Sequence, residues 1–155
     1  MKPLTITAAI HIQKPLAEVF HAIANKDEMS NYFISWASES IRKEGQTIQW
    51  RFPEMDLQFP VRVGRVDAPN SLEFFWDDEN GNETRVKMEL TDKGNGSTKV
   101  DITEGEKPAD GEGITWYGRN TEGWANFLAC LKAWVEYGIN LRKNAFGPEQ
   151  MPEVQ

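Results

Sequence analysis

The sequence ITWYGRNTEGWANFLACLKAWVEYGINL occupies residues 114–141 and has the longest helical periodicity in the chain. At about 100° per residue, one face of the predicted helix carries Tyr117, Asn120, Trp124, Phe127, Leu128, Leu131 and Val135. The opposite face carries Arg119, Glu122, Asn126, Lys132 and Glu136, with some mixing. An amphipathic helix of this length needs an apolar surface to cover.

The sequence predicts such a surface between about Ile34 and Glu104, where apolar and polar residues alternate as in half-buried strands. A hairpin is expected between Ser38–Lys43 and Thr47–Phe52. Pro60 indicates a strand that lies at a sheet edge or carries a bulge. Successive strands joined by short turns predict an antiparallel meander. The segment Glu104–Lys107 is expected to link the last strand to the long helix.

The N-terminal residues complete the predicted architecture. Ile6, Ala8, Ile10 and Ile12 share one face of a first strand. Pro15 begins a short helix, and a further helical turn or two over 26–31 leads to Tyr32 and Phe33. We predict an α+β fold in which a curved antiparallel sheet of about seven strands wraps on the C-terminal helix. One domain is expected over residues 1–155, with a loose tail over 143–155.

Composition excludes several classes of protein. The 155 residues are 39% hydrophobic and 26% charged, which is typical of a globular domain. Asp and Glu outnumber Lys and Arg by 24 to 17, so neither nucleic acid nor an anionic membrane is an expected partner. A single cysteine, Cys130, fits a reducing compartment. With no recognisable signal peptide, these features predict a cytoplasmic protein. The oligomeric state is left open.

The aromatic content of 6 Trp, 8 Phe and 3 Tyr allows two interpretations. The rings could fill an ordinary core, or some of them could line a cavity between sheet and helix for an apolar ligand. Asn120 on the inward helix face could bond a ligand, a strand backbone or a water. The candidate ligand-binding residues are Trp50, Phe52, Phe59, Phe74, Trp76, Met88, Tyr117, Asn120, Trp124 and Phe127.

Three segments together resemble the heat-shock protein 90 ATPase activator homologue family, within the START/Bet v 1-like (SRPBCC) superfamily. They are PLAEVFHAI at 15–23, LEFFW at 72–76 and EGWANFLACLK at 122–132, with Gly138 near the helix end. The resemblance covers about Thr5 to Leu141. It implies a helix-grip fold that holds an apolar ligand, and it implies a chaperone as a second candidate partner in the stress response.

The sequence offers little for catalysis. His11 and His21 lack neighbours at metal-ligand spacing, so we expect no metal and no cofactor. Cys130 is expected to be a buried structural thiol. The acidic residues from Asp77 to Glu83 are expected to form a solvated loop, because they lack calcium-loop spacing.

Three functions follow from these patterns. The first is a binding module for an apolar or amphipathic small molecule. The second is a cyclase- or hydrolase-type enzyme in the same cavity, which would need a titratable pair facing inward. The third is a chaperone-regulating or stress-response interaction protein, which rests on family analogy. The apolar inward rows favour the binding module over the enzyme.

Overall fold

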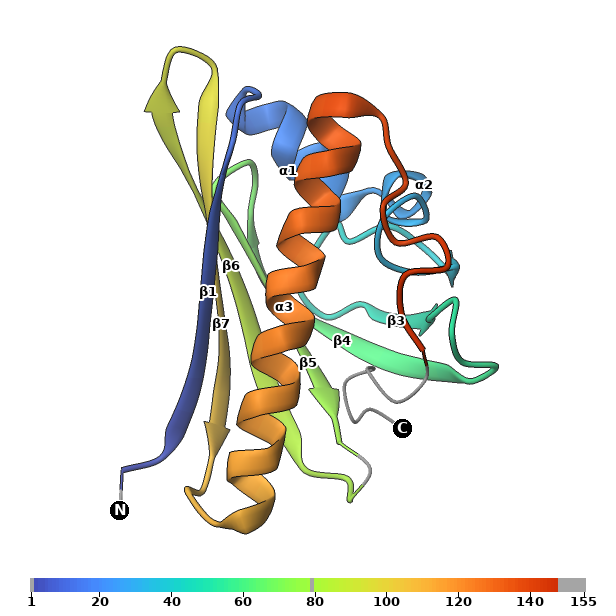
Figure 1. Ribbon diagram of the computed structural model, residues 1–155, viewed down its shortest axis with the longest axis vertical. Helices are drawn as coiled ribbons and strands as arrows, with labels where there is room; N and C mark the ends of the chain where they lie inside the picture. Colours follow the sequence, from blue (N-terminus) through green and yellow to red (C-terminus); the bar gives the residue numbers. More distant parts are fainter. Residues whose placement is uncertain (1, 79, 148–155) are drawn as a thin grey trace.

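The computed structural model describes residues 2–78 and 80–147 (Figure 1). The secondary structure follows the predicted order of strand, two short helices, meander and long helix. The elements are β1 (Leu4–Ile12), α1 (Leu16–Ala24), α2 (Lys26–Met29), β2 (Trp36–Ala37), β3 (Thr47–Arg51), β4 (Gln58–Asp67), β5 (Ser71–Asp77), β6 (Glu83–Gly94), β7 (Ser97–Lys107) and α3 (Gly111–Tyr137).

The strands form one antiparallel seven-stranded sheet in the order β1-β7-β6-β5-β4-β3-β2. Strands β2 to β7 pair in sequence as a meander, and β1 pairs with β7 at the other edge. Side chains of β5 alternate between buried and half-buried, as expected for a sheet covered on one face. The predicted α+β helix-grip fold is therefore confirmed.

Helix α3 lies across the sheet, with α1 beside its C-terminal end (Figure 1). It begins three residues earlier than predicted, because the Asp110 side chain accepts a hydrogen bond from Gly113 N at 2.8 Å. It also ends earlier, because Gly138 adopts the left-handed conformation at φ +67°. The chain then turns back past α2 towards β3 and β4 (Figure 1).

The predicted strand at Ser38–Lys43 is wrong, since β2 contains Trp36 and Ala37 alone. Ser38 N still donates to Gln49 O of β3 at 2.9 Å, but backbone groups further along the segment bond elsewhere. Ile41 N donates to Ala24 O at 2.9 Å, and the Gln46 carboxamide oxygen accepts from Arg42 N and Lys43 N. A side chain thus replaces the strand partner, an alternative that polar side chains near turns commonly provide.

The bulge predicted near Pro60 lies a few residues later in β4. The register between β4 and β5 shifts between Val63 and Val66. A Cβ atom on Gly64 would lie 3.0 Å from the Glu73 Cβ, so the two backbones approach closely there. Pro60 itself pairs with Gln49 of β3 and precedes the part of β4 that pairs with β5. Its missing N–H therefore breaks no bond to β5.

Candidate functional site

Nine of the ten predicted ligand-binding side chains form a buried cluster between the sheet and α3. The cluster comes from β3 to β6, the residue after β3, and the inward face of α3. Each member is at most 3% exposed: Trp50, Phe52, Phe59, Phe74, Trp76, Met88, Asn120, Trp124 and Phe127. The structure thus shows them as packed core, and their role toward a ligand stays a prediction.

Tyr117 does not share the inward face of α3, and its predicted position is wrong. Its side chain is 40% exposed, whereas its neighbour Trp116 is 2% exposed. Burial of Trp116 turns Tyr117 towards solvent, because adjacent helix positions differ by about 100°. The Lys107 ammonium lies 5.3 Å from the Trp116 ring centroid and covers it.

Phe33 joins the cluster, although the sequence patterns did not single it out as a site residue. Its ring centroid lies 4.7 Å from that of Phe127 and 5.4 Å from those of both Trp50 and Phe52, all edge-on. Its place at the end of the turn after α2, to which the family-like segment at 15–23 leads, was the available signal. Phe33 connects the buried rings to the surface segment around it.

A buried carboxylate lies at the centre of the cluster. Glu104 of β7 is 1% exposed. Its Oε1 accepts from Trp124 Nε1 at 2.9 Å and Asn120 Nδ2 at 3.1 Å. Its Oε2 accepts from Trp76 Nε1 at 2.8 Å and Thr84 Oγ1 at 2.5 Å. A carboxylate offers about four lone-pair positions, and four donors occupy those of Glu104. Glu104 therefore has no lone pair left with which to act as a general base.

The prediction that Glu104–Lys107 forms a linker is wrong, because β7 runs to Lys107. The alternation of inward and outward positions along β7 already indicated that the strand continues through Glu104. Thr98, Val100 and Ile102 lie on the inward row, and the next position of that row is Glu104. The charge hid this continuation, because an unpaired inward carboxylate would be costly. The indole and amide donors on other elements remove that cost.

Two buried polar atoms of the cluster have no hydrogen-bond partner among the described residues. They are the donor Trp50 Nε1 and the acceptor Asn120 Oδ1. The Asn120 side-chain N–H donates to Glu104, and the Asn120 carbonyl oxygen remains buried. Buried polar groups are usually satisfied, so both atoms could bond a small polar group within the cluster.

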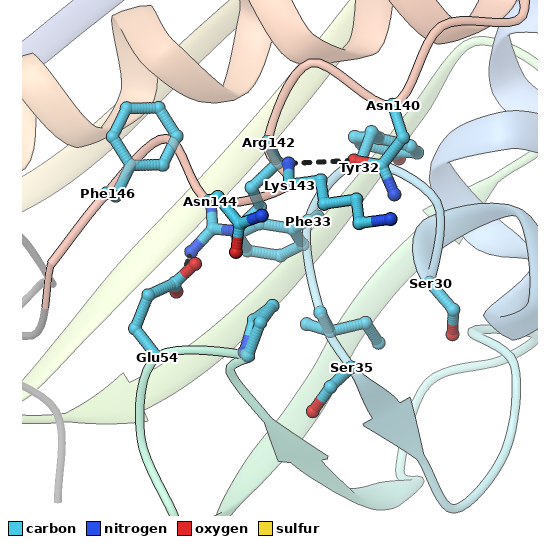
Figure 2. Close-up of a pocket in the computed structure, with 12 residues that line it drawn as sticks. Ser30, Tyr32, Phe33, Ser35, Glu54, Asn140, Arg142, Lys143, Asn144 and Phe146 are labelled. Atoms are coloured by element: carbon cyan, nitrogen blue, oxygen red, sulfur yellow. Dashed lines mark hydrogen bonds and ion pairs between the residues drawn. The ribbon is translucent and has the colours of Figure 1, made fainter.

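A pocket of about 500 Å³ opens at the edge of the cluster (Figure 2). It lies between the segment after α2, the loop between β3 and β4, and the segment after α3. Its volume falls in the range typical of small-molecule sites. The lining residues are Ser30, Tyr32, Phe33, Ile34, Ser35, Pro53, Glu54, Asn140, Arg142, Lys143, Asn144 and Phe146. The pocket therefore touches the cluster through Phe33.

One wall of the pocket is held by a buried ion pair between Arg142 and Glu54. The guanidinium Nη2 lies 2.7 Å from Glu54 Oε1, and the side chains are 8% and 9% exposed. The guanidinium also lies over the rings of Phe52 and Phe146, 5.5 and 5.3 Å from their centroids. Arg142 thus joins the segment after α3 to the loop between β3 and β4.

The pocket carries an excess of positive charge in an acidic protein. Arg142 and Lys143 face one acidic lining residue, Glu54. Lys143 forms no ion pair with any residue in the described part of the chain, and its side chain extends across the pocket (Figure 2). Tyr32 adds no charge, because burial, together with the Glu28 charge, raises the pKa of its phenol well above the usual value. Its hydroxyl donates to Ala22 O at 2.8 Å.

The remaining candidates from the sequence do not line this pocket. His11 and His21 are exposed, and Cys130 is buried, as predicted. The acidic loop is not simply solvated. Asp78 is 8% exposed, forms an ion pair with Lys107 and accepts from Asn80 N and Asn82 N at 2.9 Å. Glu79 of that loop lies outside the described residues.

Within residues 2–78 and 80–147, no group of three His, Cys, Asp or Glu side chains could hold a metal ion. The tail predicted from residue 143 is described as far as Gly147, and residues 148–155 lie outside the described part. Its described portion supplies Lys143, Asn144 and Phe146 to the pocket. None of the described helices combines the length and apolarity needed to cross a bilayer.

Comparison with known proteins places this fold in a family. The family model described as "Activator of Hsp90 ATPase homolog 1-like protein" matches residues 13–136. A solved structure of a protein from Staphylococcus saprophyticus is 25% identical with a TM-score of 0.76, covering 90% of this chain and 96% of that one. No curated protein sequence matches the chain.

Two further structures share the fold at lower identity. The Aha1 dimer from Colwellia psychrerythraea is 19% identical with a TM-score of 0.74, covering 87% of this chain and 98% of that one. CalU16 from Micromonospora echinospora is 16% identical with a TM-score of 0.69, covering 96% of this chain and 80% of that one. At these identities the likeness concerns the fold alone.

Proposed function

The chain belongs to the activator of Hsp90 ATPase homolog 1-like family, and we propose that it is a small-molecule binding domain whose ligand is amphipathic. The observation that carries the proposal is the pocket of about 500 Å³, which combines apolar and polar lining residues at the edge of the aromatic cluster. Sites for small molecules are typically concave and apolar, with a few polar groups that fix orientation.

In this proposal, the polar end of the ligand lies among Asn140, Lys143 and Asn144, on the segment after α3. The apolar end packs on Phe33 and reaches the cluster as that ring moves. The predicted residues Trp50, Phe52, Trp124 and Phe127 then meet the ligand through Phe33, which already contacts all four rings. Trp50 Nε1 and Asn120 Oδ1, which have no hydrogen-bond partner in the described part of the chain, offer a donor and an acceptor deeper in the cluster.

Binding can be tested with the neutral fluorophore N-phenyl-1-naphthylamine and by native mass spectrometry of the full chain. We expect saturable one-to-one binding, together with a change in tryptophan emission as Phe33 moves against Trp50 and Trp124. Native spectra should show one bound probe per chain.

Ser30→Trp should fill the pocket and abolish binding. Thr115→Trp is the matched control, because Ser30 and Thr115 are both exposed and both donate to the carbonyl four residues earlier in a helix. Thr115 does not line the pocket. Equal binding by the two variants, or no binding of any amphiphile by the wild-type chain, would refute the proposal.

A further inference from the structure

Arg142 is the most strongly held cation of the pocket, and it already has an ion-pair partner, Glu54. Its guanidinium lies between two phenylalanine rings and against the carboxylate of Glu54. Both members of the ion pair are more than nine-tenths buried. A planar guanidinium in such a setting is suited to carboxylate or phosphate groups, which it can bind through two parallel hydrogen bonds.

The carboxylate of Glu54 is held on one side only. Glu54 lies in the loop between β3 and β4, and the only hydrogen-bond partner of its side chain among the described residues is Arg142. Arg142, in contrast, is also held by the two phenylalanine rings. A second anion that reached the guanidinium could therefore displace Glu54 without breaking another hydrogen bond that the Glu54 side chain forms among the described residues. Loop segments accommodate such shifts more readily than strands.

A second cation lies at the same pocket, with no acidic partner within residues 2–78 and 80–147. Lys143 follows Arg142 directly in the sequence and lines the pocket. Asn140 and Asn144 add amide groups on the same segment, and Asn144 adopts a positive φ of 58°. The pocket thus offers a charge of +2 to an incoming anion once Glu54 has moved away, and a net +1 before.

We propose, building on the proposed function, that the ligand is an amphiphile with one acidic head group, and that this head group replaces Glu54 as the ion-pair partner of Arg142. The chain of the ligand lies against Phe33 and Phe146, and Lys143 contributes to the binding of the head group. Glu54 then acts as an internal competitor that keeps Arg142 paired in the empty pocket, where an unpaired buried charge would be costly.

Displacement of the bound fluorophore by four twelve-carbon amphiphiles tests this exchange. Dodecanoate and dodecyl phosphate carry acidic heads, dodecanol is neutral and dodecyltrimethylammonium is cationic, all kept below their micelle concentrations. We expect the acidic compounds to bind at least about ten-fold more tightly than dodecanol, and salt to weaken only the acidic ones. The carboxylate and phosphate arms show which acidic head is preferred.

Glu54→Gln is the decisive variant, because it removes the competing charge while retaining an oxygen that accepts from Arg142. It should tighten dodecanoate binding by about five-fold or more and leave dodecanol unchanged. Asp56→Asn is the matched control, since Asp56 is an exposed acid of the same loop that does not line the pocket. Lys143→Gln should weaken the acidic ligands alone.

The outcomes separate this inference from the proposed function. Equal affinity for acidic and neutral amphiphiles, or the same gain from Glu54→Gln and Asp56→Asn, would overturn the exchange while the binding domain stands. Failure of all four amphiphiles to bind would overturn both. A stable fold of each variant is checked by its urea unfolding transition before the titrations are compared.

Discussion

The indole rings of Trp76 and Trp124 stack with centroids 5.6 Å apart and an angle of 29° between their planes. Trp76 belongs to β5 and Trp124 to α3, and both ring N–H groups donate to opposite oxygens of the Glu104 carboxylate. One acidic side chain from a third element, β7, therefore fixes the sheet and the helix in one arrangement. Its polar contacts specify the register of α3 on the sheet more sharply than apolar packing alone could.

Glu104→Ala should destabilise the fold by more than about 3 kcal/mol, because it leaves buried donors unpaired and opens a cavity. Glu104→Gln keeps the shape and turns one acceptor oxygen into a donor, which opposes the indole N–H of Trp76 or Trp124. It should cost about 1–3 kcal/mol. Urea unfolding measured by tryptophan emission gives both values.

Glu106→Gln provides the control for Glu104, two residues further along the same strand and exposed. It should change the unfolding free energy by less than about 0.5 kcal/mol. A Glu104→Gln variant as stable as the wild type would show that the charge of this carboxylate contributes nothing to the four hydrogen bonds.

Local periodicity was sufficient to predict the main architecture. Alternation in 71–77 and helical spacing in 120–131 each identify a buried face, because each pattern is set by the geometry of one element. The buried aromatic residues followed from those faces. The period-two pattern also places Glu104 on the inward row of its strand, but that prediction requires accepting a charged residue on a buried face. The donors that stabilise this charge lie on β5, β6 and α3, so the local pattern does not show them.

The pocket could not be predicted in the same way. Arg142 and Glu54 are 88 positions apart, and both lie outside regular elements. Nothing in a repeating pattern links a residue after a helix to a loop between two strands. The failed strand at Ser38–Lys43 has a related cause, since the Gln46 side chain competes with strand pairing through bonds that a binary pattern does not show.

Two glycines, one within α3 and one directly after its last residue, should respond to alanine in opposite directions. Gly138 ends the helix at a φ of +67°, where a Cβ is strained although no other atom lies within 4 Å. Gly138→Ala should therefore cost about 1 kcal/mol. Gly118 lies within the helix, exposed and also with open space around its Cβ position. Gly118→Ala should stabilise the protein by about 1 kcal/mol.

Each glycine variant is the control for the other, because both add one methyl group, one within α3 and one at the residue that ends it. Urea unfolding of the two variants under identical conditions gives the comparison. A loss of stability in both would contradict the assignment of Gly118 to regular helix, and a gain in both would contradict the strain at Gly138.

Asp78 should make folding stability depend on pH in the acid range. Burial alone would raise the pKa of this carboxyl, but the hydrogen bonds from Lys107 and from the backbone of Asn82 and Asn80 outweigh it, so the pKa is lowered. The folded state thus favours the charged form. This contribution is fully present above the unfolded pKa of about 3.9 and is lost as pH falls through the lower folded value.

Asp78→Asn retains an oxygen for the two backbone donors and removes the ion pair with Lys107. We expect a loss of about 2 kcal/mol at pH 7, and the difference from wild type should shrink below about pH 4. Asp101→Asn removes an exposed partner of Lys99 and should cost less than about 1 kcal/mol. A wild-type-to-variant difference that stays constant from pH 7 to pH 3 would contradict this role for Asp78.

Cys130 should report on opening of the protein near the Arg142–Glu54 pair. The thiol is 1% exposed, and burial is the main cause that raises its pKa, with Glu54 raising it further and Arg142 opposing both. Thiolate is the reacting form.

At pH 8 the native protein should therefore react with Ellman's reagent at least about a hundred-fold more slowly than the urea-unfolded chain. Because the pKa is raised, the native rate should still increase above pH 9, where the unfolded rate levels off. Comparable rates in the two states would show that the α3 face carrying Cys130 is open to solvent.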